Sequence, residues 1–188
     1  DLNQAGGVFV FKNQNKLNNW KKFSVAINFE NTNVLNNSIY SAGTNPTNSI
    51  ANYFSSYANG ISENLITSNP YEALSYNEQQ AYLGYEGYII NPLDDTNDDN
   101  TTYFSNVTPG GNYYQENSVY SSGYNGKLSF NAAASFENKF YIGLNLNSHF
   151  TDYVRSTSFY ESNNNPLGTD HTVRNMRFDN NLHTFGTG

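Results

Sequence analysis

Hydrophobic and polar residues alternate strictly along three segments of this chain, residues 20–30, 128–136 and 140–147. A period of two is typical of a β-strand that has one apolar face and one polar face. An apolar run in residues 8–12 and a weaker alternation in residues 172–184 predict two further strands. The pattern therefore predicts five strands and an all-β fold.

The connections between these strands differ widely in length. Residues 13–19 and 137–139 are short polar turns, residues 31–115 form a long connection, and residues 161–171 form an intermediate one. In an up-and-down sheet, both short turns fall at one end and both longer connections at the other. Antiparallel transmembrane barrels have this asymmetry, with short periplasmic turns and long extracellular loops. Each alternating span has about 9–11 residues, the length that a tilted strand needs to cross a hydrocarbon core.

Aromatic residues occupy positions that suit the interfacial girdles of such a barrel. Trp20 lies at the short-turn end of one strand, and Tyr120 and Tyr124 lie near the loop end of another. A soluble β-sandwich, whose apolar parity faces a second sheet, explains the alternation equally well. The mean hydropathy of −0.68 and the lack of an apolar run near about 18 residues predict no transmembrane helix. They do not exclude a barrel, because alternating strands average to a polar score.

Two short amphipathic helices are predicted within the long connection, which is expected to be an extracellular loop. The first follows an N-cap at Asn48 or Ser49 and stops at Gly60. The second begins at a capping box that starts with Ser75, and Pro92 ends it. Tyrosines occur at helical spacing in both segments, so we expect both helices to carry tyrosine-rich faces.

The composition narrows the classes of function. The 188 residues are 37% hydrophobic, 16% aromatic and only 13% charged, and they include 34 Asn. Solubility therefore comes from Asn, Ser and Thr, which argues against a helical bundle. A net charge of −7 with nine Lys and Arg leaves no basic patch for nucleic acid. The lack of cysteine excludes disulfides, thiolate metal sites and cysteine nucleophiles.

An acidic cluster in the long connection is a candidate calcium site, made by Asp94, Asp95, Asp98 and Asp99. Carboxylate oxygens are hard ligands of the kind that Ca²⁺ takes. The segment lacks the glycine and the terminal glutamate of the helix-loop-helix calcium motif, so a solvated acidic loop is the competing interpretation. No other cofactor is predicted.

The remaining polar residues do not form a pattern that indicates catalysis. His149, His171 and His183 are far apart in sequence, and His149 and His183 lie on the polar parities of their strands. Arg177 lies on the polar parity of the last strand, where it could meet an anionic ligand, with pairing to Glu30 or Asp179 as the alternative. No nucleophile elbow, phosphate loop or paired-carboxylate motif stands out. We therefore do not expect an enzyme.

Several segments in order resemble one known family. They are GGVFVFK, WKKFSVAINFENTN, SIANYFSSYANG, YSSGYNGKLSFNAAASFENKFYIGLNL and FDNNLHTFGTG. Together they resemble the outer-membrane long-chain fatty acid porins, in the form found in Bacteroidetes-type bacteria. The similarity covers nearly the whole chain and rests on patterned segments without a single sharp motif.

The resemblance implies an outer-membrane barrel of about fourteen strands, plugged by an N-terminal hatch, that takes up hydrophobic molecules by diffusion. This chain would hold roughly the second to the sixth strand, as a piece of an N-terminal half without the hatch. Residues 1–188 would then be part of one barrel domain, with residues 31–115 as the inserted loop. The family's outer loops are thought to offer an apolar groove for the ligand. We place it at Ile50, Tyr53, Phe54, Tyr57 and Ile61, although the same residues would also suit packing between the two helices.

The expected function is passive uptake of hydrophobic small molecules such as long-chain fatty acids. Expected partners are outer-membrane lipid, lipopolysaccharide, the hydrophobic ligand and other outer-membrane proteins. Two alternatives stay open at this point. The same barrel could serve as a subunit of an envelope protein-secretion or outer-membrane complex, or the chain could be a soluble secreted β-sandwich for binding or adhesion.

Overall fold

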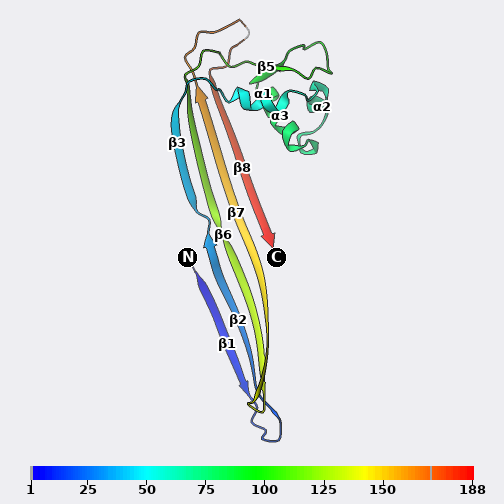
Figure 1. The fold of residues 1–188 in the computed structure, drawn as a ribbon, viewed down its shortest axis with the longest axis vertical. Helices are drawn as coiled ribbons and strands as arrows, with labels where there is room; N and C mark the ends of the chain where they lie inside the picture. The colour runs from blue at the N-terminus through cyan, green and yellow to red at the C-terminus, as the bar shows by residue number, and fades with distance from the viewer. Residues whose placement is uncertain (1, 170) are drawn as a thin grey trace. The chain divides into compact units, whose positions relative to one another are not determined.

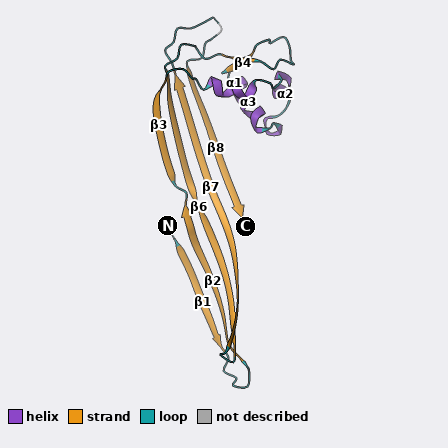
Figure 2. Ribbon diagram, viewed as in Figure 1, coloured by secondary structure: helices purple, strands orange, loops and turns teal. Residues whose placement is uncertain are grey.

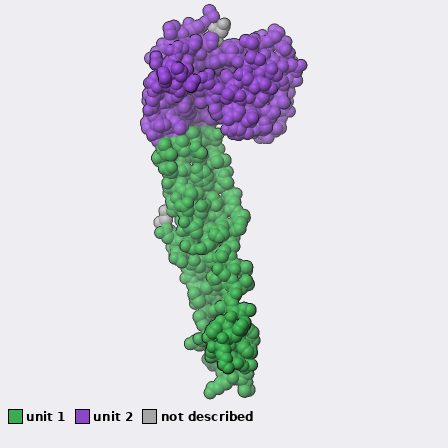
Figure 3. Space-filling view, viewed as in Figure 1, with its two compact units in different colours: residues 1–39, 119–157, 180–188 green, residues 40–118, 158–179 purple. Residues whose placement is uncertain are grey.

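A computed structural model describes residues 2–169 and 171–188. The chain is mostly antiparallel β-sheet, with 54% of its residues in strands and 15% in helices. It divides into two compact units, coloured in Figure 3 and described separately below. Unit 1 comprises residues 1–39, 119–157 and 180–188, and unit 2 comprises residues 40–118 and 158–179.

Consecutive long strands are neighbours in the main sheet, whose order is β1-β2-β6-β7-β8 (Figures 1 and 2). A further strand, β3, also pairs with β6. Their bounds are β1 Gln4–Lys12, β2 Trp20–Val34, β3 Asn37–Asn45, β6 Tyr113–Phe136, β7 Phe140–Ser162 and β8 Asn175–Thr187. The five predicted strands and the all-β class are confirmed. Within the described residues the sheet is open, because β1 and β8 are its two end strands.

The predicted length of the strands and the start of the long connection are wrong. β6 has 24 residues and β7 has 23, more than twice the about 9–11 residues of a minimal tilted span. β2 continues to Val34, and β3 follows it at Asn37–Asn45, so the loop predicted over 31–115 is confined to residues 46–112. β3 escaped detection because Asn, Ser and Thr on both of its faces leave no alternation to read.

Gly123 explains how β2 ends and β3 begins along the same edge of β6. Its φ is +141°, a conformation that side chains with a Cβ rarely adopt. The carbonyl of Gly123 accepts from the Leu35 amide at 2.9 Å, and its amide donates to the Asn36 side chain at 3.2 Å. The irregularity of β6 at Gly123 therefore lies beside the break between β2 and β3.

Asparagine side chains build the short turns of unit 1. In the β1–β2 turn, Asn13, Asn15 and Asn18 each accept from the backbone amide two residues further on, at 2.9 to 3.0 Å. These are Asx turns, which replace missing backbone partners. In the β6–β7 turn, Glu137 and Asn138 have φ of 50° and 54°. Both short polar turns are confirmed.

The long connection folds as helices and a small hairpin within unit 2. Its elements are α1 Ala51–Ala58, α2 Glu63–Ser68, a 3₁₀ turn at Tyr71–Ala73, α3 Tyr76–Glu86, β4 Ile90–Pro92 and β5 Tyr103–Ser105. The two predicted helices are confirmed as α1 and α3, and the capping box of Ser75 and Glu78 is present. α3 ends at Glu86, with Gly87 as its C-cap, so the prediction that Pro92 ends it is wrong. Pro92 belongs to β4.

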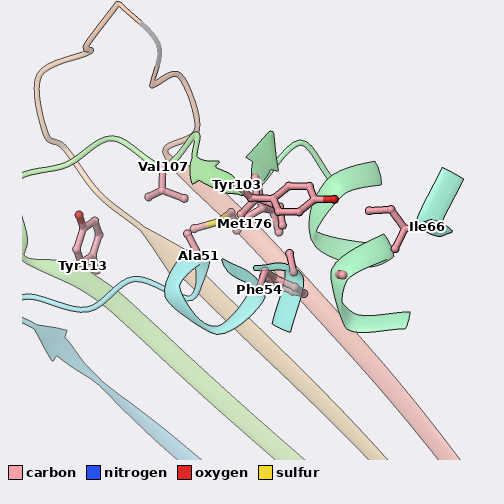
Figure 4. Packing of buried hydrophobic residues seen from close by; sticks show 11 residues of the cluster. Ala51, Phe54, Ile66, Tyr103, Val107, Tyr113 and Met176 are labelled. Carbon is pink, nitrogen blue, oxygen red and sulfur yellow. The ribbon is translucent and has the colours of Figure 1, made fainter. Parts of the chain in front are cut away.

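The buried hydrophobic core lies in unit 2. Phe54 of α1, Ile66 of α2 and Ile90 of β4 are fully buried. Met176 of β8 and Tyr113 of β6 join the same cluster (Figure 4). Gly84 of α3 faces Phe54 so closely that a Cβ there would overlap the ring, so α1 and α3 pack tightly at this point.

Candidate functional surfaces

Unit 1 carries a continuous apolar face across β1, β2 and β6. The register places Phe11 opposite Phe23, and Ile27 opposite Phe130. Residues directly opposite in antiparallel strands project from the same side of the sheet. The apolar face comprises Phe9, Phe11, Phe23, Val25, Ile27, Phe29, Leu128, Phe130, Ala132 and Ala134. Ile142 and Leu144 of β7 border the same surface as Phe23.

The apolar face is exposed. Phe9 is 61% exposed, Ile27 48% and Phe130 44%. Scattered apolar residues are common on protein surfaces, but a contiguous apolar patch spread over four strands marks a site of contact with lipid or with another protein. The face is thus the strongest functional signal in unit 1.

Aromatic pairs lie at both ends of the apolar face. The rings of Trp20 and Phe136 meet edge to face at 5.3 Å at the short-turn end. Nearer Gly123, the Phe150 ring lies 6.0 Å from the rings of both Phe29 and Tyr124. Aromatic rings at two levels are the arrangement of interfacial belts in membrane barrels.

The opposite face of unit 1 is polar and internally bonded. Lys127 and Glu30 form an ion pair at 2.7 Å. Ser129 donates to Asn147 at 2.8 Å, and Thr151 donates to Asn125 at 3.0 Å. These contacts connect neighbouring strands through side chains that can also bond water. In β1, β2 and β6 of unit 1, one face of the sheet is therefore apolar and the other is largely polar.

Both strand histidines were predicted on the polar face, and the prediction is confirmed for His149 and wrong for His183. The backbone amide and carbonyl of His149 pair with those of Gly188, and His149 shares the polar side with Asn147. Counting back along β8 from Gly188, His183 projects from the other side. There its ring lies 2.9 Å from Asp152. The sequence could not reveal this, because the register between β7 and β8 decides it.

Four of the five residues predicted as a ligand groove belong to the core of unit 2 or pack against it, and Tyr57 is the exception. Phe54 is fully buried, and its ring meets Phe178 edge to face at 5.6 Å. Ile50, Tyr53 and Ile61 pack against the same cluster and are partly buried. The predicted positions do come together, but their apolar faces contact protein. Phe54 is therefore not accessible to a ligand in this arrangement.

Tyrosine rings from α1 and α3 meet at the surface of unit 2. Tyr57 lies 4.9 Å from Tyr53 and 5.9 Å from Tyr76, measured between ring centroids. The Tyr53 hydroxyl lies 3.3 Å from that of Tyr76 and donates to Gln80 at 3.0 Å. Burial and the neighbouring Tyr76 raise the pKa of Tyr53. We call Tyr53, Tyr57 and Tyr76 the tyrosine patch.

Two further tyrosines stabilise the helices and are poor candidates for catalysis. The Tyr85 hydroxyl donates to Glu63 at 2.9 Å, and burial together with this bond raises the pKa of Tyr85 to about 12. Burial and the charge of Glu63 raise the pKa of Tyr103 to about 12. Both phenols remain protonated at neutral pH, so neither can act as a base.

A buried glutamate that the sequence did not single out holds the start of α1. Glu161 of β7 has no exposed surface. Its two oxygens accept from the Ser49 hydroxyl at 2.5 Å, the Ile50 amide at 2.8 Å and the Gln115 side chain at 2.7 Å. A carboxylate at a helix N-terminus also interacts favourably with the helix dipole. The predicted N-cap at Asn48 or Ser49 is wrong, because Ile50 is the N-cap of α1. Glu161, which accepts from the Ile50 amide, lies 112 positions beyond Ser49.

Arg177 forms an ion pair with Asp179 at 3.1 Å, one of the alternatives left open by the sequence, whereas Glu30 pairs with Lys127. Met176 and Phe178 contact the core of unit 2. The alternation of β8 therefore directs Arg177 away from that core.

The candidate calcium segment lies on the surface of unit 2. Asp94, Asp95, Asp98 and Asp99 are all exposed. Asp94 accepts from the amide and hydroxyl of Thr96, at 3.1 and 2.7 Å, and these bonds lower the pKa of its carboxyl. In the part of the chain that the structure describes, no three acidic or histidine side chains are grouped so as to hold a metal.

Among the described residues, none of the helices has the length and apolar character needed to cross a membrane. Comparisons with protein-family models, with curated proteins and with solved structures found no match for this chain.

Proposed function

We propose that this chain is part of an antiparallel transmembrane β-barrel in a bacterial outer membrane, working in passive uptake of hydrophobic small molecules such as long-chain fatty acids. The observation that carries the barrel proposal is the two-faced sheet of unit 1. An apolar face that remains exposed across four strands requires an apolar medium, and hydrocarbon supplies it. The polar face, with its ion pair and amide contacts, suits a water-filled interior.

The same observation favours the barrel over a soluble sandwich. A sandwich buries its apolar parity against a second sheet, whereas Phe9, Ile27 and Phe130 are each at least 44% exposed. The aromatic pairs at Trp20 and Phe150 add the two interfacial levels that a barrel needs. A subunit of an envelope complex would use the same sheet, and it remains the second candidate within the barrel class.

Uptake is proposed from the resemblance of the sequence to fatty acid porins, and we propose a surface of unit 2 for capture of the ligand. Since Phe54 is buried, we assign first contact with a hydrophobic ligand to the tyrosine patch. Tyr76 is 59% exposed, and the rings of Tyr53 and Tyr57 continue the surface. Aromatic rings combine a large apolar area with a polar edge, which suits an amphiphilic ligand.

The membrane part of the proposal is tested with the native protein that carries this chain. Envelope fractions are separated, and migration on a gel is compared with and without heating in mild detergent. We expect the protein in the outer-membrane fraction, with a fast-migrating folded form that slows after boiling. Recovery in the soluble fraction, with no change of migration on heating, would contradict the barrel.

The uptake part is tested separately in cells that express the protein or lack it. We expect expression to accelerate entry of a labelled long-chain fatty acid, and the double variant Tyr57→Ala with Tyr76→Ala to slow it. Tyr141→Ala, on β7 of unit 1, is the control. Equal uptake with and without the protein, while it remains in the outer membrane, would favour the complex subunit.

A further inference from the structure

Three side chains lie in a row across β1, β2 and β6 near the short turns. The register pairs Lys12 with Lys22, and Lys22 with Ser135. Directly opposite residues of antiparallel strands have Cβ atoms about 4.5–5.5 Å apart on one side of the sheet. The row belongs to the polar face of unit 1, because Phe11, Phe23 and their neighbours occupy the other side.

The two ammonium groups in this row lack a counter-ion. Like charges directly opposite each other destabilise a pair of strands. In the described part of the chain, neither Lys12 nor Lys22 forms an ion pair, and the carboxylate of Glu30 on the same face is taken by Lys127. The row is therefore a place of uncompensated positive charge.

The third member of the row has an unused hydrogen-bonding group. Ser135 is only 3% exposed, and its hydroxyl oxygen has no hydrogen-bond partner among the described residues. A buried polar group without a partner is unfavourable. Thus an unpartnered hydroxyl lies beside two unpaired cations, and one anion could satisfy all three.

We propose that Lys12, Lys22 and Ser135 bind the phosphoryl group of a phosphate monoester. Three donor groups match the three terminal oxygens of such a group. Its charge of about −1.5 to −2 at neutral pH offsets the two ammonium groups. A carboxylate supplies one negative charge and two oxygens, so it would leave one cation without a partner.

The neighbouring residues on the same face indicate what carries the phosphoryl group. Val8 and Val10 precede Lys12 on this side of β1 and are 68% and 55% exposed. Val8 lies opposite Ala26, so a small apolar strip adjoins the cationic row on an otherwise polar face. The site therefore takes a phosphate ester with an apolar chain. This inference depends on the register of unit 1 and does not require the sheet to lie in a membrane.

The test is calorimetric titration of the protein, purified in an uncharged detergent, with hexyl phosphate, inorganic phosphate and hexanoate. We expect hexyl phosphate to bind most tightly. Lys12→Gln and Lys22→Gln should each weaken its binding by about tenfold or more, since each removes a charge-assisted contact. Ser135→Ala should weaken it less. Lys16→Gln removes one charge from the adjacent turn and should leave binding unchanged.

Other outcomes would overturn the proposal. The proposal fails if hexyl phosphate does not bind the wild-type protein. It also fails if the Lys12→Gln and Lys22→Gln variants bind hexyl phosphate as tightly as the wild type does. Equal affinity for hexanoate would contradict a phosphoryl ligand, and equal affinity for inorganic phosphate would contradict the apolar chain. Circular dichroism of each variant ensures that a loss of binding is not a loss of folding.

Discussion

The two units use similar residues in opposite ways. In unit 2, Phe54 and Ile66 are fully buried, and the helices close around them. In unit 1, Phe9 and Ile27 are about half exposed or more, in regular register across a sheet. Unit 2 therefore has the organisation of a domain that folds in water. Unit 1 leaves its apolar side chains exposed on one side of the sheet, which marks a surface for contact with lipid or with another protein.

The largest expected effect comes from comparing a Phe→Ala substitution in unit 2 with one in unit 1. Phe54→Ala should destabilise unit 2 by about 3–5 kcal/mol, because it leaves a cavity beside Phe178 and Gly84. Phe23→Ala in unit 1 should cost far less in detergent, since the ring is 47% exposed. Hydrogen exchange of α1 and α3 amides measures the difference. Equal protection in both variants would contradict the division into a packed unit and an outward-facing one.

A second pair of variants tests the two faces of one strand. Ile27 and Asn28 are adjacent on β2 but project from opposite sides. Ile27→Lys should lower folding into lipid bilayers by about 2–4 kcal/mol if it lies near the bilayer midplane. Asn28→Lys on the polar face should have little effect. The measurement is the fraction of heat-modifiable protein after reconstitution, and equal losses would argue against a lipid-facing side.

Within unit 2, Glu161→Gln should be destabilising by about 1–3 kcal/mol, because an amide nitrogen would replace one of the oxygens that face the three donors. Glu72→Gln, on the surface, removes the same charge without a buried contact. Thermal unfolding monitored at α1 compares them. Similar midpoints for the two variants would contradict a capping role for Glu161.

The smallest effect concerns pH. Hydrogen bonds from the backbone and side chain of Ser75 lower the pKa of Glu78 from 4.5. The capping contribution is therefore complete above pH 4.5 and is lost as the pH falls through the lower pKa of the folded state. Protection of the first amides of α3, measured relative to the intrinsic exchange rate at each pH, should fall on acidification in the wild type. In Glu78→Gln this dependence should be absent, and its persistence would implicate another group.

Local patterns in the sequence predicted the elements well. Alternation found β2 and the paired parts of β6 and β7, and the capping box found α3, because both signals lie within a few residues. Long-range pairing could not be predicted in this way. Glu161, which binds the start of α1, lies 112 positions beyond Ser49 in the sequence. The side of the sheet from which His183 projects depends on the register between β8 and β7. The burial of Phe54 likewise depends on Phe178, which no local pattern connects to α1.

The most direct test of the central claim is the environment of residues 23–29 in the folded protein in lipid. Because the chain has no cysteine, single cysteines carrying a spin label can be introduced one at a time. We predict that labels at the odd positions are accessible to oxygen dissolved in the bilayer, and labels at the even positions to a water-soluble nickel complex. Labels at the odd positions that are shielded from both reagents, or that are open to the nickel complex, would contradict a lipid-facing sheet.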